Sequence, residues 1–198
     1  MILNRIFQSK ARGFFVDIGA HHPRRFSNTF FFYKRGWSGI NVEPNPDLIR
    51  VFKAERKRDI NLQCGVAEKE GVLRYYSFDE PALNTFDNSL VQWRLENTPY
   101  KVVSQTDVAV LRLDGILSSN LPTGIQIDFL SVDVEGLDFS VLKSNSWSLF
   151  RPSYVLTEVL ASNLEEASVN PVCLFMREQG YRLFAKTYNT FIFKDLQA

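Results

Sequence analysis

Residues 14–23 read FFVDIGAHHP, an apolar run that is closed by an aspartate, a glycine and two histidines. The run is too short for a helix and Gly13 precedes it, so it predicts a buried strand over 14–18 followed by a tight turn. Short apolar runs of the same kind recur at 39–42, 61–64, 129–133 and 154–157, with helical stretches between several of them. This alternation is typical of βαβ units, and it predicts an α/β fold with a mainly parallel sheet.

The end and the middle of the chain carry further strands. Apolar runs at 181–186 and 190–194 are joined by so few residues that the two strands must be antiparallel. An alternating segment at 71–78 predicts an extra strand, and residues 108–113 predict another. Between them, residues 79–105 are polar and show no steady period. A length of 198 residues suits one domain over 1–198, in which 79–105 forms a lid or an acceptor-binding insertion.

Composition excludes several classes of protein. The 23 Lys and Arg residues balance 22 Asp and Glu residues, so the net charge of +1 gives no long-range attraction for nucleic acid or for an anionic membrane. The basic run 50–58 fits the solvated face of a helix. The sequence has no membrane span of about 18 apolar residues and no signal peptide. Two distant cysteines predict free thiols, and we expect a cytoplasmic protein.

The turn after the first strand bears on the ligand. Ligands of open α/β sheets bind at the carboxyl ends of the strands, where this chain places acidic residues and glycines. Gly19 begins no GxGxxG motif, because the next two glycine positions hold His21 and Arg24. A pyrophosphate needs backbone approach on both sides, so the turn disfavours a dinucleotide. It favours S-adenosylmethionine (SAM), which consists of a sulfonium, an amino-acid end and a nucleoside.

Two acidic strand ends suggest how the cofactor is held. Glu43 follows Gly19 by 24 residues and closes the second strand, where a carboxylate can accept both ribose hydroxyl protons. Asp133 ends an apolar strand and therefore needs a partner or a ligand. It could hold the methionyl ammonium of SAM. Alternatively, Asp133, Glu135 and Glu158 hold a divalent cation such as Mg²⁺. Glu135 also has a structural explanation, since acidic residues are common at helix starts.

The base is predicted to be a histidine. His21 and His22 are the two histidines of the chain, and both lie in the glycine turn. A neutral imidazole at this place can deprotonate an attacking hydroxyl. Asp133 is the next candidate base. The metal-free route through a histidine is preferred over the route through Mg²⁺.

Four segments resemble the FkbM-like family of SAM-dependent methyltransferases over residues 13–194. They are FFVDIGAHHPRRFSNTFFFYKRGWSGINVEPNP, LRLDGIL, FLSVDVEGLDFSVLKSNSW and RPSYVLTEVL, with the DIGAxxP, EPNP and DVEGxD motifs in that order. The resemblance implies a Rossmann-like class I methyltransferase fold with a seven-stranded, mostly parallel sheet and an antiparallel last strand. It also implies O-methylation of a hydroxyl on a sugar, a polysaccharide precursor or a natural product.

The resemblance assigns roles to individual residues. The resemblance implies that SAM is bound by residues from four places in the chain. They are Asp17, Gly19 and Ala20 in the first turn, Glu43 at the second strand end, Cys64, Gly65 and Val66 along the adenine, and Asp133, Glu135 and Gly136 near the methyl group. The implied partner is a small-molecule or sugar-containing acceptor.

Three alternatives compete with this function. A nicotinamide-dependent oxidoreductase would need the phosphate-binding glycine loop that this turn lacks. A nucleic-acid methyltransferase would need a basic face, which the charge balance does not favour. A SAM-fold binding protein without turnover would use the same residues as the enzyme, so a SAM titration followed by a turnover assay separates the two. The sequence predicts neither the acceptor's identity nor an oligomeric state.

Overall fold

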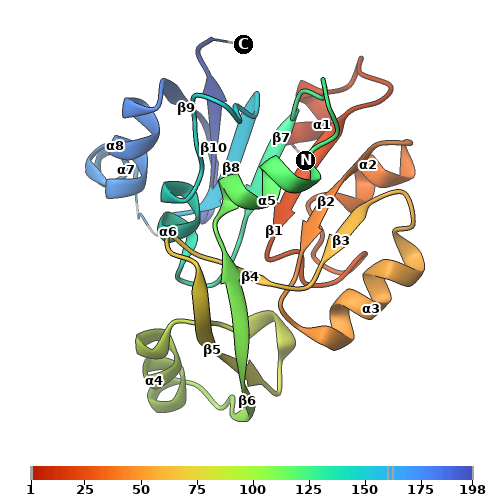
Figure 1. The fold of residues 1–198 in the computed structure, drawn as a ribbon. Coiled ribbons are helices and arrows are strands. Elements are labelled where there is room, and N and C mark those ends of the chain that lie inside the picture. Colours follow the sequence, from red (N-terminus) through yellow and green to blue (C-terminus); the bar gives the residue numbers. More distant parts are fainter. Residues whose placement is uncertain (1, 160, 162, 198) are drawn as a thin grey trace.

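A seven-stranded sheet forms the centre of the protein, as the computed structural model of residues 2–159, 161 and 163–197 shows (Figure 1). The strand order is β3-β2-β1-β7-β8-β10-β9, and only β10 runs against the others. The sheet predicted from the sequence is thus confirmed, including its antiparallel last strand. The strands are β1 (Phe14–Ile18), β2 (Ser38–Val42), β3 (Ile60–Leu62), β7 (Phe129–Val132), β8 (Tyr154–Glu158), β9 (Tyr181–Thr187) and β10 (Thr190–Asp195).

Both faces of this sheet are covered, because successive side chains of each strand point to opposite sides. Phe15 of β1 and Phe129 of β7 pack with residues of α1 (Ile2–Ile6) and α2 (Phe30–Lys34) on one face. Val16 and Leu130 belong to the larger core on the other face. Its helices are α5 (Leu113–Asn120), α6 (Asp138–Lys143), α7 (Leu164–Val169) and α8 (Pro171–Glu178). The strands therefore read as continuous apolar runs, which is typical of a parallel sheet buried on both sides.

Helix starts follow capping chemistry in the sequence. Helix α3 (Pro46–Glu55) begins after Asn45, whose side chain accepts hydrogen bonds from the backbone of Asp47 and Leu48. Before α2, the Ser27 hydroxyl accepts hydrogen bonds from the backbone N–H groups of Thr29 and Phe30. Helix α7 was not predicted from the sequence.

Arg56 corrects the interpretation of the basic run 50–58 as a solvated helix face. This side chain is fully buried just beyond α3, where its Nε donates to Asp59 over 2.8 Å. It also donates to the Thr29 hydroxyl and to the Pro23 carbonyl, each over 3.0 Å. A buried guanidinium needs such partners. Arg56 thereby fixes the loop that follows β1 to the end of α3.

Between β3 and β7 the chain forms a second, three-stranded sheet, whose two long strands lie in the lower part of Figure 1. It consists of β4 (Gly65–Val66), β6 (Val102–Leu111) and β5 (Gly71–Phe78), in the order β4-β6-β5. The strand predicted over 71–78 is confirmed. The strand predicted over 61–64 stops at Leu62, because the chain then leaves the main sheet for β4.

The prediction of an irregular segment over 79–105 is wrong. The segment contains the 3-10 helix η1 (Pro81–Leu83), the ten-residue helix α4 (Asn88–Asn97) and the first part of β6. Helix α4 has its apolar residues on more than one side, so it lacks the helical period that sequence analysis seeks. Strand β6 is exposed along most of its length and is held by pairing with β5.

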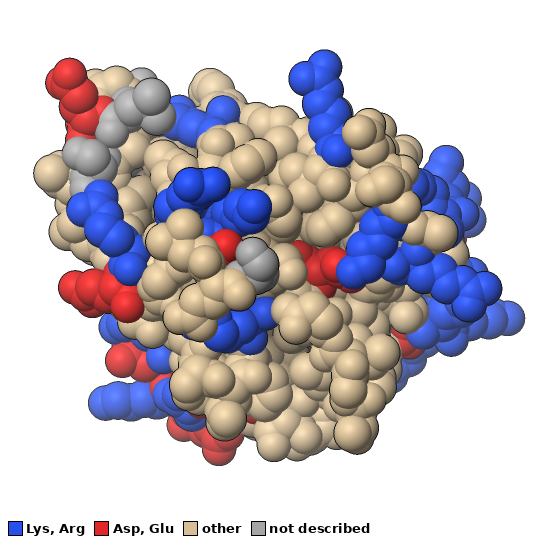
Figure 2. All heavy atoms as spheres, turned by 90° about the horizontal axis from the view of Figure 1, so that it is seen from above, with Lys and Arg blue, Asp and Glu red and all other residues tan. Residues whose placement is uncertain are grey.

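The surface agrees with the balanced charge. On the face seen from above, Lys and Arg side chains stand in separate groups at the rim and within the face, with uncharged surface and a few Asp and Glu side chains between them (Figure 2). Among the described residues, no helix is long and apolar enough to cross a membrane.

Candidate functional site

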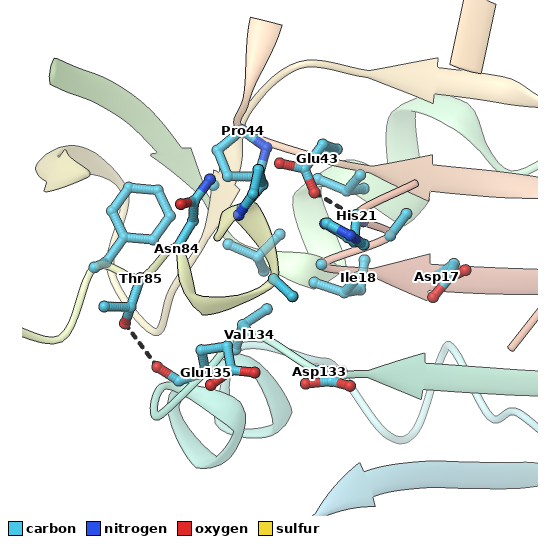
Figure 3. Close-up of a pocket in the computed structure, with 18 of the residues that line it drawn as sticks. Asp17, Ile18, His21, Glu43, Pro44, Asn84, Thr85, Asp133, Val134 and Glu135 are labelled. Carbon is cyan, nitrogen blue, oxygen red and sulfur yellow. Dashed lines mark hydrogen bonds between the residues drawn. The ribbon is translucent and has the colours of Figure 1, made fainter. Parts of the chain in front are cut away.

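A cavity of about 250 Å³ opens at the carboxyl ends of β1, β2 and β7. This is just below the range of roughly 300–1,000 Å³ usual for small-molecule pockets. In Figure 3, Glu43 and His21 lie together above Asp133 and Glu135, while Asn84 and Thr85 approach from the inserted segment. The lining includes most of the residues predicted for the site: Asp17, Gly19, Ala20, His21, Glu43, Cys64, Gly65, Val66, Asp133 and Glu135. His22 and Glu158 are not part of it.

Gly19, in the turn after β1, lies against the ends of both neighbouring strands, β2 and β7. Its backbone N–H donates to the Val42 carbonyl over 3.0 Å, and that of Ala20 donates to the same oxygen over 3.1 Å. Gly19 has a φ of +77°, and a Cβ at this position would lie 1.8 Å from the carbonyl oxygen of Asp133. Both the conformation and the contact therefore require glycine.

Glu43 is held at the floor of the cavity by two backbone donors. The N–H of His21 donates to Oε2 over 2.9 Å, and the N–H of Asn45 donates to Oε1 over 2.8 Å. The side chain is 3% exposed, and its burial raises the pKa to about 7. Each carboxylate oxygen can accept more than one hydrogen bond, so Glu43 retains acceptor capacity toward the cavity.

Asp17 lies deeper, and protein groups already hold its carboxylate. The Thr29 hydroxyl donates to Oδ2 over 2.9 Å. Burial raises the pKa to about 6, while this hydrogen bond and nearby Arg56 oppose the rise. Asp17 thus connects the cavity to the buried Arg56 network.

Four carboxyl groups gather at the ends of β7 and β8. The surrounding protein keeps water away from Asp133 and so raises its pKa, and the nearby carboxylates of Asp138, Glu135 and Glu158 raise it further. The Asp133 side chain is nevertheless open to the cavity. Asp138 is 6% exposed, and burial together with Glu158 raises its pKa to about 7. Like charges so close in an enclosed site are relieved by protonation or by a bound cation.

The inserted segment reaches the cavity through Glu135. The Thr85 hydroxyl donates to the Glu135 backbone carbonyl over 2.7 Å, and Arg94 of α4 forms an ion pair with its carboxylate. Glu135 has a φ of +55°, an uncommon conformation outside glycine, which these two contacts stabilise.

Sequence reasoning missed Arg94, Thr85 and Asn84. One signal of the hidden helix was available, since Asp87 precedes α4 and accepts from the backbone of Ser89 and Leu90.

Gly65, Tyr75 and Phe86 form a part of the cavity wall that is largely apolar. Phe86 packs directly over Gly65, where a Cβ would lie 2.7 Å from the ring. Tyr75 lies beside Phe86, with ring centroids 4.8 Å apart. The buried Asn84 side-chain nitrogen interacts with the Tyr75 hydroxyl but makes no well-formed hydrogen bond within the described part of the chain. The unsatisfied Asn84 nitrogen at this wall is available to donate to an acceptor atom of a bound ligand.

The two histidines have different surroundings. His21 lines the cavity with a φ of +52°, and burial, His22 and Arg25 lower its pKa. The neutral, basic form of His21 is therefore favoured at neutral pH. His22 instead accepts from the backbone N–H groups of Arg24 and Arg25 through Nδ1, each over 3.1 Å.

The predicted metal ligands do not form a metal site in this arrangement. Within the ranges that the structure describes, no group of three or more His, Cys, Asp or Glu residues is placed to hold a metal ion. Glu135 pairs with Arg94, and Glu158 accepts from the side chain of Asn189 over 3.2 Å.

Comparisons with known proteins relate the chain to one family. Residues 17–183 match the family described as the methyltransferase FkbM domain. A solved structure described as a human methyltransferase 10 domain containing protein aligns with 92% of this chain and 69% of its own, with 11% identity and a TM-score of 0.36. No curated protein matches the chain significantly.

Proposed function

The chain belongs to the FkbM methyltransferase family, and from this premise we propose that it uses SAM to methylate a hydroxyl oxygen. One observation carries the choice of cofactor. Among the described residues that line the cavity, the acidic side chains are Asp17, Glu43, Asp133 and Glu135, and none is Lys or Arg. Such a lining repels a pyrophosphate and attracts a cation. It therefore supports SAM over a nicotinamide dinucleotide.

The residues fit the three parts of SAM. Glu43 would accept hydrogen bonds from the ribose hydroxyls with its free lone pairs. The Gly65–Phe86 wall would contact the adenine, and the unsatisfied Asn84 nitrogen would donate to it. Asp133 would face the methionyl ammonium. When bound, the cofactor supplies an electrophilic methyl group on a sulfonium.

The chain's own contribution to chemistry is proton removal and orientation. We assign the base to His21, which lies in the cavity in a form that accepts a proton. His22 is engaged by the loop backbone through Nδ1, so it is the weaker candidate. Asp133 is the alternative base. We also propose that the chain acts as one domain in which residues 79–105 form the acceptor-binding insertion.

Calorimetric titration with SAM and with S-adenosylhomocysteine tests the cofactor. Glu43→Ala should weaken SAM binding by about 1.5–3 kcal/mol, the value of a hydrogen bond to a charged group. Asp47→Ala is the matched control, because Asp47 is an exposed acid at the start of α3 that does not line the cavity. Equal SAM affinity in wild type and Glu43→Ala, with the fold intact, would contradict the assignment.

A turnover assay separates an enzyme from a non-catalytic binder and tests the base. His21→Ala should lower kcat by about 10²–10⁴-fold, the usual contribution of a general base, while His22→Ala should retain most activity. Activity that is lost in EDTA and restored by Mg²⁺ would instead support the metal route. Full activity in both histidine variants would make Asp133 the base to test.

A further inference from the structure

Phe26 is an exposed aromatic side chain at the mouth of the cavity. It is 74% exposed, yet it belongs to the cavity lining. Its ring stacks against the His21 imidazole, with centroids 6.4 Å apart and 21° between the planes. The ring therefore continues the cavity wall from the proposed base outward to solvent.

The backbone at Phe26 is held in an unfavourable conformation. Its φ is +57°, a region that bulky side chains rarely occupy. The loop is fixed on both sides of this residue. His22 accepts from the backbone of Arg24 and Arg25 before it, and Ser27 accepts from the two N–H groups that begin α2 after it. Strain that is maintained at a cavity mouth points to a function for the side chain.

The groups beside the ring are polar. The Arg25 guanidinium lies 4.7 Å from the ring centroid and pairs with Glu80 over 3.2 Å. Ser27 and Asn28 also line this part of the cavity. Because Arg25 and Glu80 neutralise each other, the surroundings favour an uncharged ligand rich in hydrogen-bonding groups.

These features match one chemical class of acceptor. The face of an aromatic ring carries partial negative charge and attracts polarised C–H groups. A pyranose ring presents a face of such C–H groups and a rim of hydroxyls. A flat aromatic acceptor would gain little from the polar neighbours of Phe26, whereas the hydroxyls of a sugar would pair with them.

We propose that Phe26 is the platform on which the ring of a neutral pyranoside acceptor stacks, with a hydroxyl directed toward His21. This inference rests on the proposed function and names its acceptor class. Phe26 is then a specificity-determining residue: it sets which ring can approach the cavity and leaves cofactor binding unaffected.

Three variants test the role of the ring. Phe26→Gly and Phe26→Asn remove it and suit the positive φ, so both should fold at least as well as wild type. Phe26→Trp keeps an aromatic face. Tyr188→Gly is the matched control, because Tyr188 is 89% exposed at a φ of +44° and does not line the cavity.

The measurement is saturation-transfer NMR with methyl glycosides of glucose, mannose, galactose and rhamnose, in the presence of S-adenosylhomocysteine. We expect transfer to ring C–H protons of at least one glycoside in wild type, Phe26→Trp and Tyr188→Gly. Phe26→Gly and Phe26→Asn should raise its dissociation constant about two- to twelvefold, the range for losing one ring-stacking contact. No transfer from any glycoside, or an unchanged constant in both ring-less variants, would overturn the proposal.

Calorimetry with S-adenosylhomocysteine on the same samples separates the two proposals. Binding of this ligand without any glycoside signal would reject the pyranoside platform and leave the methyltransferase function standing. Failure to bind both it and SAM would reject the proposed function itself.

Discussion

Replacing Gly19 with alanine should disrupt the cofactor turn more than the backbone conformation alone requires. Gly19 and Gly124 have nearly the same φ, +77° and +76°. A Cβ at Gly124 would meet no atom within 4 Å, whereas one at Gly19 would lie 1.8 Å from the Asp133 carbonyl oxygen. The pair therefore separates the cost of the conformation from the cost of the contact.

The expected magnitudes follow from these two costs. A left-handed conformation costs a residue with a Cβ about 1–2 kcal/mol, so Gly124→Ala should lower the free energy of unfolding by that amount. Forcing an extra methyl into a packed site adds about 1–3 kcal/mol. Gly19→Ala should therefore lower the free energy of unfolding by about 2–5 kcal/mol. The obstructing atom belongs to the backbone, so the ends of β1 and β7 must separate.

Urea unfolding and SAM calorimetry measure the two consequences. Gly124→Ala should bind SAM with wild-type affinity, and Gly19→Ala should bind it at least about tenfold more weakly, since about 1.4 kcal/mol corresponds to that factor. Equal loss of stability in the two variants would refute the packing argument. Wild-type SAM affinity in a destabilised Gly19→Ala would refute the placement of the turn in the cofactor site.

Two further predictions concern the acids and the insertion. Burial raises the pKa of Glu43 to about 7, so the folded protein binds more protons than the unfolded chain above the ordinary pKa of 4.5. The free energy of unfolding without ligand should therefore fall by about 1–3 kcal/mol as pH rises from about 4.5 to 7. The fall should be less steep in Glu43→Gln. Urea titrations that show no fall would contradict this prediction. Arg94→Met removes the partner of Glu135 and should raise proteolysis of 79–105 and iodide quenching of exposed Trp93. Arg74→Met breaks an exposed pair with Asp107, between β5 and β6, and should change neither. Identical behaviour of the two Arg variants would show that the Arg94 pair does not hold the insertion.

The main sheet could be predicted because its strands are buried on both faces. Residues such as Val16 and Leu130 have no exposed side to interrupt the apolar run. Parallel strands also bring their carboxyl ends to one edge, so the sequence alone predicts that Gly19, Glu43 and Asp133 lie together. The partners that fix each of them were not visible, because hydrogen bonds such as that from His21 to Glu43 depend on the turn's backbone conformation.

Arg56 and Arg94 show why the remainder was hidden. Both are buried arginines that bind distant segments, Arg56 the Pro23 carbonyl and Arg94 the Glu135 carboxylate, and composition alone favours an exposed position for arginine. Of strand β6, only the end was predicted, from residue 108 onward, because residues 102–107 are mostly exposed and are held by pairing with β5. These are long-range contacts that no local period encodes.

The least predictable part of the chain is also the part that completes the cavity. The main sheet supplies the turn and the acids, and it follows general rules for parallel α/β folds. The insertion supplies Thr85 and Arg94 to Glu135, and Asn84 and Phe86 to the apolar wall. A segment that is held by a few specific contacts can change its sequence without disturbing the sheet beneath it. We therefore expect acceptor specificity to depend on the insertion and on the Phe26 loop, while cofactor binding depends on the sheet edge.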